Sequence, residues 1–302
     1  MSRAGASTRV ADQLKDTSLL PSPLHPSRPS KKLKLQSSAD PFPNFGHPTP
    51  TEVREVFELL STSFKGPVPA RSSRASIQTK NTGATCGDSP NVIDALIGTI
   101  LSQNTSSRNS STAKHALDTR FGKHNFAAIA DAPLADVVEA LRRGGLANKK
   151  AATIKNLLQE IKAKHGEYSL QHLASTPPSD VRSNGDIMEE LMSYDGVGPK
   201  TAACVLLFCI GRDSFAVDTH VFRLSKMLGW VPRDADRIKT QMHLDRRIPD
   251  ELKYGLHVMM IRHGKACKGC KREGTKRVCI LKAWVCSKHV EGRDTKPATT
   301  VE

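Results

Sequence analysis

Apolar residues recur at the three- and four-residue spacing of an α-helix over most of the chain between residues 51 and 290. The clearest case runs from Val92 to Leu101, and Ser89 and Pro90 just before it are typical of an N-cap and a first helical position. Alternation of apolar and polar residues, which would indicate strands, does not extend to any convincing length. The pattern therefore predicts an all-α fold.

Capping and helix-breaking residues place several other helices. Asp186 and Glu189 match a capping box that opens a short helix reaching Met192. The stretch from Gly66 to Asp88, rich in Pro, Ser and Thr, predicts a long surface loop. Three more helices are predicted at Glu52–Leu60, around Val137, Val138 and Leu141 between Pro133 and Gly144, and around Ile154, Leu157, Leu158 and Ile161.

Residues 191–208 are the most informative run, because two predicted helices meet there at a glycine-rich turn. Gly196 and Gly198 reverse the chain between the helices. Pro199 then starts the second helix, whose apolar residues continue to Ile210. Such a turn presents unpaired backbone N–H groups and the positive end of a helix, which together can dock a phosphate. The alternative interpretation is a glycine-rich connection between two packed helices.

Two residues near this turn carry candidate chemistry. Lys200 lies in the first turn of an otherwise apolar helix, where the helix dipole opposes a positive charge and is expected to lower the pKa of the amine. A neutral amine is the form that a nucleophile needs. Asp218 precedes a helix that is predicted to run to Leu228 and to end at Gly229, so it is a good N-cap. Capping alone is one interpretation of Asp218, and an oriented, ionised catalytic carboxylate is the other.

The charge of the chain points to a polyanionic partner. The 302 residues include 45 Lys and Arg against 30 Asp and Glu, a formal charge of +15. Residues 1–50 contain eight prolines and a basic surplus, and we expect them to be disordered. Within them, Arg28–Lys34 resembles a short nuclear-localisation signal, although a merely solvated tail would have the same composition. Residues 262–302 hold eleven basic and four acidic residues, a surplus of +7.

The cysteines suggest a metal site. No run approaches the roughly 18 apolar residues of a membrane span, and the N-terminus lacks the apolar stretch of a secretory signal, so we expect an intracellular protein with no membrane partner. In a reducing compartment, clustered cysteines favour metal binding over disulfides. Cys204 and Cys209 fall in an apolar helix and are expected in the core, and Cys86 has no evident role. The cluster consists of Cys267, Cys270, Cys279 and Cys286.

The sequence around the turn resembles a known family. Gly-Val-Gly-Pro-Lys-Thr-Ala at residues 196–202 and Ala-Val-Asp-Thr-His-Val-Phe-Arg at residues 216–223 are similar to the helix-hairpin-helix-Gly-Pro-Asp (HhH-GPD) superfamily of DNA glycosylases, specifically its endonuclease III-like branch. The resemblance covers roughly residues 50–290 and includes Leu101–Thr105, Gly145–Ala151 and Ile261–Lys265.

This resemblance implies a fold and domain boundaries. We expect a helical glycosylase domain at residues 51–290, built of two subdomains with a DNA cleft between them. One subdomain would hold the central helices, and the other would hold the first helix together with the C-terminal helices. The helix-hairpin-helix would lie at about residues 187–210, and residues 291–302 would form a disordered tail.

The resemblance also implies an activity, that of a bifunctional DNA glycosylase and AP lyase in base excision repair. Lys200 would attack the sugar and expel the base, while Asp218 would help to keep the amine deprotonated and would stabilise positive charge on the sugar. β-Elimination from the resulting Schiff base would then nick the strand. The flipped base, expected to be an oxidised pyrimidine, would lie near Gln103. The residues implied to hold the DNA backbone are Gly196, Val197, Gly198 and Thr201.

For the cysteine loop, residues 267–286, the resemblance implies a [4Fe–4S] cluster bound by the four clustered cysteines. The spacing here, Cys-x2-Cys-x8-Cys-x6-Cys, differs from the family's usual Cys-x6-Cys-x2-Cys-x5-Cys. Zinc held by the same thiolates and a metal-free basic loop that contacts DNA are therefore the alternatives. Asp195 is a second departure, because an acidic residue beside a phosphate site weakens DNA binding unless it points away.

Two other functions stay open. Leu228–Pro232, Leu-Gly-Trp-Val-Pro, is similar to plant DNA-demethylating members, which leaves room for a glycosylase of methylated or mismatched bases. A non-catalytic helix-hairpin-helix DNA-binding protein is the other alternative. The expected partner of the enzyme is double-stranded DNA with damaged or abasic nucleotides, bound by a monomer. The expected location is the nucleus, with the mitochondrion as a second compartment.

Overall fold

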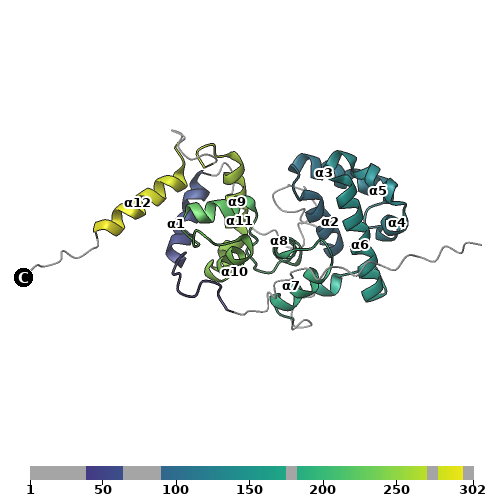
Figure 1. Ribbon diagram of the computed structural model, residues 1–302, viewed down its shortest axis with the longest axis horizontal. Coiled ribbons are helices and arrows are strands. Elements are labelled where there is room, and N and C mark those ends of the chain that lie inside the picture. Colours follow the sequence, from purple (N-terminus) through teal and green to yellow (C-terminus); the bar gives the residue numbers. More distant parts are fainter. Residues whose placement is uncertain (1–38, 64–89, 175–181, 271–277, 295–302) are drawn as a thin grey trace, which may run out of the picture. The chain divides into compact units, whose positions relative to one another are not determined.

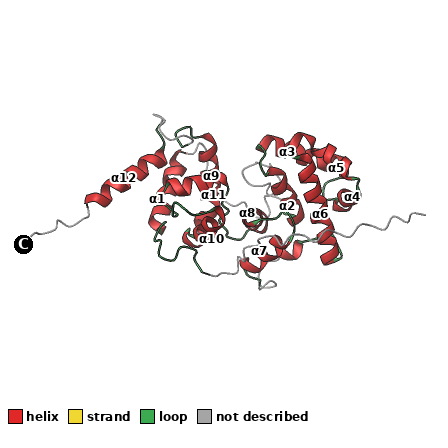
Figure 2. Cartoon of the chain, viewed as in Figure 1, coloured by secondary structure: helices red, strands yellow, loops and turns green. Residues whose placement is uncertain are grey.

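A computed structural model describes residues 39–63, 90–174, 182–270 and 278–294. In this part of the chain every regular element is a helix and no strand occurs, as the periodicity predicts (Figure 2). The segments 28–34 and 66–88 and Cys86, discussed above, lie outside the described residues. None of the described helices is both long and apolar enough to cross a membrane.

The elements carry the labels of Figure 1. In chain order they are α1 (Pro50–Ser63), α2 (Val92–Ser102), α3 (Ser107–Phe121), α4 (Phe126–Asp131), α5 (Leu134–Leu141), the 3₁₀ turn η2 (Arg142–Gly144), α6 (Ala147–His165), the 3₁₀ turn η3 (Gln171–Ala174), α7 (Asn184–Ser193), α8 (Pro199–Cys204), the π-helical turn η4 (Val205–Ile210), α9 (Thr219–Met227), α10 (Arg237–Arg247), α11 (Asp250–Ala266) and α12 (Ile280–Asp294).

The helices between residues 90 and 210 form one packed group around α2. This helix contacts α3, α6, α8 and η4, and apolar residues lie on all its sides, so nearly all of it is buried. Its N-cap is Asn91, whose side chain accepts a hydrogen bond from the N–H of Asp94 at 3.0 Å. The predicted start at Ser89 and Pro90 is therefore wrong, and the helix begins two residues later. Cys204 and Cys209 are buried in this group, as expected.

A second group joins helices that are far apart in the sequence. α11 lies beside α1 and α9, and α12 contacts α1 (Figure 1). One hydrophobic core includes Val56 of α1, Leu224 of α9, Met260 of α11 and Leu281 just inside α12. Trp230 is fully buried in the same core. The expected division into two helical subdomains is confirmed, and the Leu228–Pro232 motif belongs to the packing of the second one.

Part of the predicted disordered leader, residues 1–50, packs against the helices. The segment 39–49 packs against α10 and leads into α1. Asp40 accepts a hydrogen bond from Nδ1 of the fully buried His243 at 2.7 Å. Arg247 donates to two backbone carbonyls of the segment at 2.7 and 2.9 Å. The expectation of disorder is therefore wrong for residues 39–50, because composition does not reveal partners that a distant helix provides.

Helix α7, the first helix of the hairpin, starts earlier than predicted. Ser183 is its N-cap and accepts a hydrogen bond from the N–H of Asp186, whose carboxylate in turn accepts one from the N–H of Ser183. The capping box is therefore formed by these two residues. The box predicted at Asp186–Glu189 is wrong, because Asp186 is the third helical residue and not the cap.

The Asp40–His243 pair yields a prediction about stability. Burial opposes the ionisation of Asp40, but hydrogen bonds from His243 and from the N–H of Phe42 outweigh it and lower the pKa of this carboxyl. The pair therefore stabilises the fold above the ordinary pKa of Asp, and this contribution disappears as the pH falls through the lowered value. We expect Asp40→Asn to lower the unfolding free energy by about 1–3 kcal/mol near neutral pH and by less in acid.

Urea unfolding at neutral and at strongly acidic pH measures this difference. Asp131→Asn is the matched control, because Asp131 is exposed at the end of α4. An equal loss of stability for Asp40→Asn at both pH values would show that the charge of Asp40 does not stabilise the fold.

Candidate active site

The hairpin between α7 and α8 depends on one glycine. Gly196 has a φ of +80°, which L side chains rarely adopt. A Cβ at this position would also approach Cγ2 of Thr153 on α6 to 2.3 Å. Gly198 then caps α8, and Pro199 occupies the first turn, as the sequence predicts. The turn is therefore seated directly on α6.

The two residues before this turn are also held by α6. Tyr194 is buried, and its hydroxyl is hydrogen-bonded to Nε2 of His165 at 2.7 Å. Burial raises the pKa of Tyr194, so the hydroxyl stays protonated. The backbone N–H of Asp195 donates to Glu160 at 3.1 Å, while Asp195 is an exposed residue. Both residues thus anchor the hairpin to α6, and Asp195 is the departure from the family noted above.

A pocket of about 630 Å³ lies beside the hairpin. Gly196 and Gly198 contribute to its wall, together with Gln103 from the end of α2. Lys200 of α8 and Asp218 at the start of α9 line the same pocket. The structure therefore brings together both predicted catalytic residues, the predicted base-contacting Gln and the hairpin glycines, and it draws them from both helix groups.

Two of the residues expected to hold DNA have little accessible side chain. Val197 is buried, and its N–H donates to the carbonyl of Tyr194 at 3.3 Å. Thr201 is 4% exposed, and its hydroxyl accepts a hydrogen bond from Nε2 of Gln103 at 3.4 Å. Val197 therefore packs within the hairpin, and Thr201 lines the pocket wall. The exposed surface of the turn consists of the glycine backbone.

Asp218 caps α9, as the sequence predicts. Its Oδ1 accepts hydrogen bonds from the N–H groups of His220 and Val221, both at 2.8 Å. Because both bonds use the same oxygen, capping orients the carboxylate without engaging Oδ2. Lys200 is the second residue of α8 and is partly buried. An oriented carboxylate and a lysine amine thus share one polar pocket.

The backbone that leads to Asp218 is buried but not helical at residues 214–217. Buried peptide groups need hydrogen-bond partners, and side chains of α10 and α11 supply them here. None of these side chains was identified from the sequence. The pairs are Asp245 with the N–H of Phe215, Gln241 with the N–H of Val217, and His257 with the carbonyl of Ala216.

Gln241 connects the two candidate catalytic positions. Its Oε1 accepts the N–H of Val217 at 3.2 Å, and its Nε2 donates to the carbonyl of Pro199 at 3.1 Å. Val217 and Pro199 immediately precede Asp218 and Lys200. One buried side chain therefore holds the backbone at both positions.

His257 lies in the pocket wall and is only 1% exposed. Burial and the positive charge of Lys200 lower its pKa to about 4, although Asp218 and the hydrogen bond to Ala216 act in the opposite direction. The imidazole is therefore neutral at neutral pH. Because the carbonyl of Ala216 accepts from Nδ1 at 2.8 Å, the hydrogen resides on Nδ1 and Nε2 is an acceptor.

A buried lysine fixes the loop that presents Gln103. Nζ of Lys150 donates to the carbonyls of Leu101 and Gly144 at 2.7 and 3.2 Å and also contacts the hydroxyl of Thr105. Burial lowers the pKa of Lys150. In the sequence, Lys150 is notable only because it lies in a segment that resembles the family. Nothing in the sequence indicates that its side chain reaches the end of α2.

A comparison with models of known families shows to which family this chain belongs. The model of the family described as HhH-GPD superfamily base excision DNA repair protein matches residues 97–250, just over half of the chain. This range contains Gln103, the hairpin, Lys200 and Asp218. The chain belongs to the HhH-GPD superfamily.

Similar curated proteins place this HhH-GPD protein among DNA glycosylases. A protein of Arabidopsis thaliana provisionally named a DNA glycosylase is 36% identical over 253 residues, which cover 78% of this chain and 83% of the relative. Endonuclease III of Sulfolobus acidocaldarius is 30% identical over 187 residues, 62% of this chain and 78% of that protein. DNA glycosylase/AP lyase ROS1 of Arabidopsis thaliana is 29% identical over 172 residues, 49% of this chain but 12% of that protein.

Solved structures show the fold of this branch of the superfamily. A non-covalent endonuclease III–DNA complex covers 82% of this chain and 99% of its own chain, with a TM-score of 0.58 and 23% identity. A trapped endonuclease III–DNA covalent intermediate covers 76% and 91%, with a TM-score of 0.54 and 24% identity. The fold is therefore endonuclease III-like.

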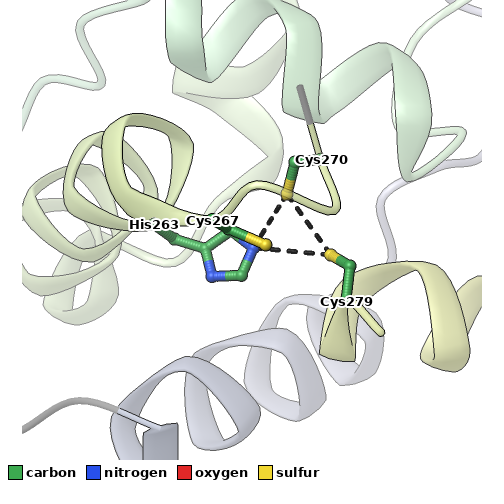
Figure 3. Close-up of side chains that lie close together, drawn as sticks. All are labelled: His263, Cys267, Cys270 and Cys279. Atoms are coloured by element: carbon green, nitrogen blue, oxygen red, sulfur yellow. Dashed lines mark hydrogen bonds between the residues drawn. The ribbon is translucent and has the colours of Figure 1, made fainter. Parts of the chain in front are cut away.

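The cysteine loop of this HhH-GPD protein differs from the expected four-cysteine set. Cys267, Cys270 and Cys279 come together with His263, and their ligand atoms all lie within 4.8 Å of one another (Figure 3). Cys286, the expected fourth ligand, is exposed on α12 and is not part of this group. Residues 271–277 of the loop lie outside the described part of the chain, and the segment from Ile280 is helical.

The electrostatics of this group suit metal ligands. Burial and the charge of Arg223 lower the pKa of His263, which favours the neutral imidazole. For Cys267, burial opposes ionisation, but hydrogen bonds from the backbone N–H groups of Cys270 and Gly269 contribute to a lowered pKa. Burial raises the pKa of Cys270, so this thiol ionises only with a compensating positive charge nearby.

His257 yields a prediction about pH. Its folded pKa of about 4 lies below the ordinary value of 6.5. His257 in the unfolded chain therefore gains a proton at a higher pH than in the folded protein. The contribution of neutral His257 to stability is fully present above pH 6.5 and is lost as the pH falls toward 4. The loss is on the order of 3 kcal/mol. His257→Gln keeps a donor for Ala216 but cannot titrate, and it should remove this part of the dependence.

Urea unfolding at closely spaced pH values measures the number of protons taken up. His115→Gln, at an exposed position of α3, is the control. The assignment fails if His257→Gln retains the wild-type slope of stability against pH in this window.

Proposed function

We propose that this protein is a bifunctional DNA glycosylase and AP lyase, which excises damaged bases from double-stranded DNA. The damaged bases that we expect it to excise are oxidised pyrimidines. The observation that carries the proposal is that Lys200 and Asp218 line one pocket beside the glycine hairpin. A monofunctional glycosylase needs the carboxylate but no lysine amine. Two relatives, endonuclease III and DNA glycosylase/AP lyase ROS1, bear names that agree with this class of reaction.

Contacts to the DNA backbone are proposed at the hairpin. Gly198 caps α8 without a side chain, so no side chain at the cap blocks the approach of a phosphate oxygen to the positive end of this helix. The exposed backbone of Gly196 allows close approach. Exposed Arg237 and Lys265 also line the pocket and add positive charge at its edge. Endonuclease III, which shares this fold, is in complex with DNA in the structure that matches this chain.

The proposed reaction begins at the nucleotide flipped into the pocket. The lone pair of the Lys200 amine forms a bond to the anomeric carbon of the sugar, and the glycosidic bond breaks. The base leaves with the electron pair of the glycosidic bond and takes up a proton. The carboxylate of Asp218 stabilises the positive charge that develops on the sugar. Because Asp218 is held by two backbone N–H groups, it needs no reorganisation during this step.

The lyase step follows from the covalent intermediate. Opening of the sugar ring converts the carbon–nitrogen bond into a protonated Schiff base, which makes the neighbouring C2′ proton acidic. Loss of this proton and departure of the 3′ phosphate nick the strand by β-elimination. Hydrolysis of the Schiff base then releases Lys200. An endonuclease III–DNA covalent intermediate has been trapped in a structure of the same fold, and this supports a covalent route.

Gln103 is the proposed contact to the base. Its amide already lies 3.4 Å from the hydroxyl of Thr201, and the Lys150 contacts fix the loop that carries it. A polar amide suits the polar edge of an oxidised pyrimidine. Trp230 of the motif similar to DNA-demethylating members lies in the hydrophobic core, so this motif does not decide which base is excised. We further propose that the protein acts as a monomer in the nucleus.

Borohydride trapping on duplex DNA with one abasic site tests the nucleophile. Wild type should form a covalent adduct, and Lys200→Gln should lower its formation by about a thousandfold or more, because the proposed adduct forms through the amine of Lys200. The matched control is Lys265→Gln, which removes an exposed lysine of the same pocket. This control should still form the adduct. It should bind DNA more weakly, and the slope of log affinity against log salt concentration should become less steep by about the contribution of one charge.

The outcomes separate the candidate functions. If wild type forms no adduct on abasic DNA but releases the base from a duplex with a damaged base, the protein is a monofunctional glycosylase. If it binds both duplexes and gives neither product, it is a non-catalytic binding protein. Equal trapping by wild type and Lys200→Gln would mean that another residue is the nucleophile. Excision from duplexes with an oxidised pyrimidine, a methylated base or a mismatch then compares the substrate classes directly.

Gln241 provides a second prediction about catalysis. We expect Gln241→Leu to lower the single-turnover rate at saturating DNA about tenfold, because two hydrogen bonds of about 1 kcal/mol each no longer hold the backbone before Lys200 and Asp218. DNA affinity should change little. Gln159→Leu, at an exposed position of α6, is the control. A variant that is folded by circular dichroism and reacts at the wild-type rate would rule out this positioning role.

A further inference from the structure

We propose that His263, Cys267, Cys270 and Cys279 bind a single tetrahedral zinc ion that fastens the start of α12 to the end of α11. The inference does not depend on the proposed catalytic activity, because it concerns the second helix group and is measured without DNA. It differs from the iron–sulfur cluster that the resemblance implies both in the ligands and in the metal.

The first argument is the spacing of the ligand atoms. Nε2 of His263 lies 2.9 Å from Sγ of Cys270 and 3.5 Å from Sγ of Cys279, and these two sulfurs are 3.3 Å apart. Bonds of about 2.0–2.3 Å to a tetrahedral zinc place neighbouring ligand atoms about 3.3–3.8 Å apart. All four side chains point toward one centre (Figure 3). These three separations lie within or below this range, so one ion fits once the ligand atoms move apart by up to roughly 0.7 Å.

A [4Fe–4S] cluster does not fit this arrangement. Its four irons and four sulfides would have to stand between the terminal ligands, and these ligand atoms lie within 4.8 Å of one another. The only further cysteine of the loop, Cys286, is exposed. It follows Cys279 by seven residues along α12, which corresponds to about 10 Å of helix. Four-cysteine ligation would require the first two turns of α12 to unwind.

The second argument is the support around the ligands. The backbone N–H groups of Gly269 and Cys270 donate to Sγ of Cys267, which is how metal-bound thiolates are commonly stabilised. Arg223 of α9 donates to the carbonyls of Cys270 and Gly264, so it braces the turn that carries the ligands. Zinc with three thiolates and one neutral imidazole has a net charge of −1, and the Arg223 cation beside it offsets this charge.

Burial gives the third argument. Cys270 and Cys279 are 6% and 3% exposed and belong to the core that contains Leu281. A structural zinc site is closed and fully protein-ligated, and its binding free energy contributes to folding. The ion would join α11 to α12, and Trp284 of α12 donates to Glu55 of α1 at 2.8 Å. One metal thus secures a contact between the first and last described helices.

Metal analysis of the full chain, purified under reducing conditions without chelator, tests the proposal. We expect one zinc per chain, no stoichiometric iron, and no visible absorption from an iron–sulfur cluster. Replacement by cobalt should give the strong near-ultraviolet bands of thiolate-to-cobalt charge transfer and the visible bands of a tetrahedral ion. Removal of the ion by a strong chelator should lower the melting temperature.

Variants separate the two ligand sets. His263→Gln and Cys279→Ser should each reduce bound zinc at least tenfold, whereas Cys286→Ser should retain one zinc and the wild-type cobalt spectrum. Cys286 is exposed, so this control does not depend on how well a ligand variant folds. Three results would overturn the proposal: about four irons per chain, loss of the metal in Cys286→Ser, or metal-free folded protein, including protein with a disulfide between Cys270 and Cys279.

Discussion

The site depends on the burial of a non-helical backbone segment, residues 214–217, between η4 and α9. Peptide groups removed from water must find partners, and this segment has neither a helix nor a strand to provide them. Asp245, Gln241 and His257 supply the partners from two other helices. The need to satisfy three buried backbone groups therefore determines where Asp218 stands. The same Gln241 reaches the first turn of α8, so the lysine position is tied to the carboxylate position.

The part of the site that could be predicted from the sequence is the part built from short-range geometry. The glycine hairpin, Lys200 and the Asp218 cap each depend on residues within one or two helical turns, and spacing alone describes such features. Gln241 and His257 lie 24 and 41 residues from the backbone groups that they satisfy. Nothing in the pattern around them distinguishes them from ordinary residues of a helix, because their role arises only when α10 and α11 pack against the segment.

Long-range pairing also explains the expectations that were wrong or only partly met. Residues 39–49 have the composition of a disordered tail, but Asp40 finds His243 at a distance of 203 residues in the sequence. The spacing of the cysteines counts residues and does not show that a helix begins after Cys279. That helix carries Cys286 away from the other cysteines, while His263 reaches them from α11. Which residues can bind one metal ion depends on where their side chains point as well as on the number of residues between them.

The shared core of α1, α11 and α12 has a consequence for the order in which the protein is made. Val56 leaves the ribosome more than two hundred residues before Met260 and Leu281 of the same core. The helices from α2 to η4 are contiguous in the chain and can pack as soon as they emerge. Until Met260 and Leu281 emerge, the apolar face of α1 lacks these packing partners. The second helix group closes over it only when the last segment of the described chain has appeared.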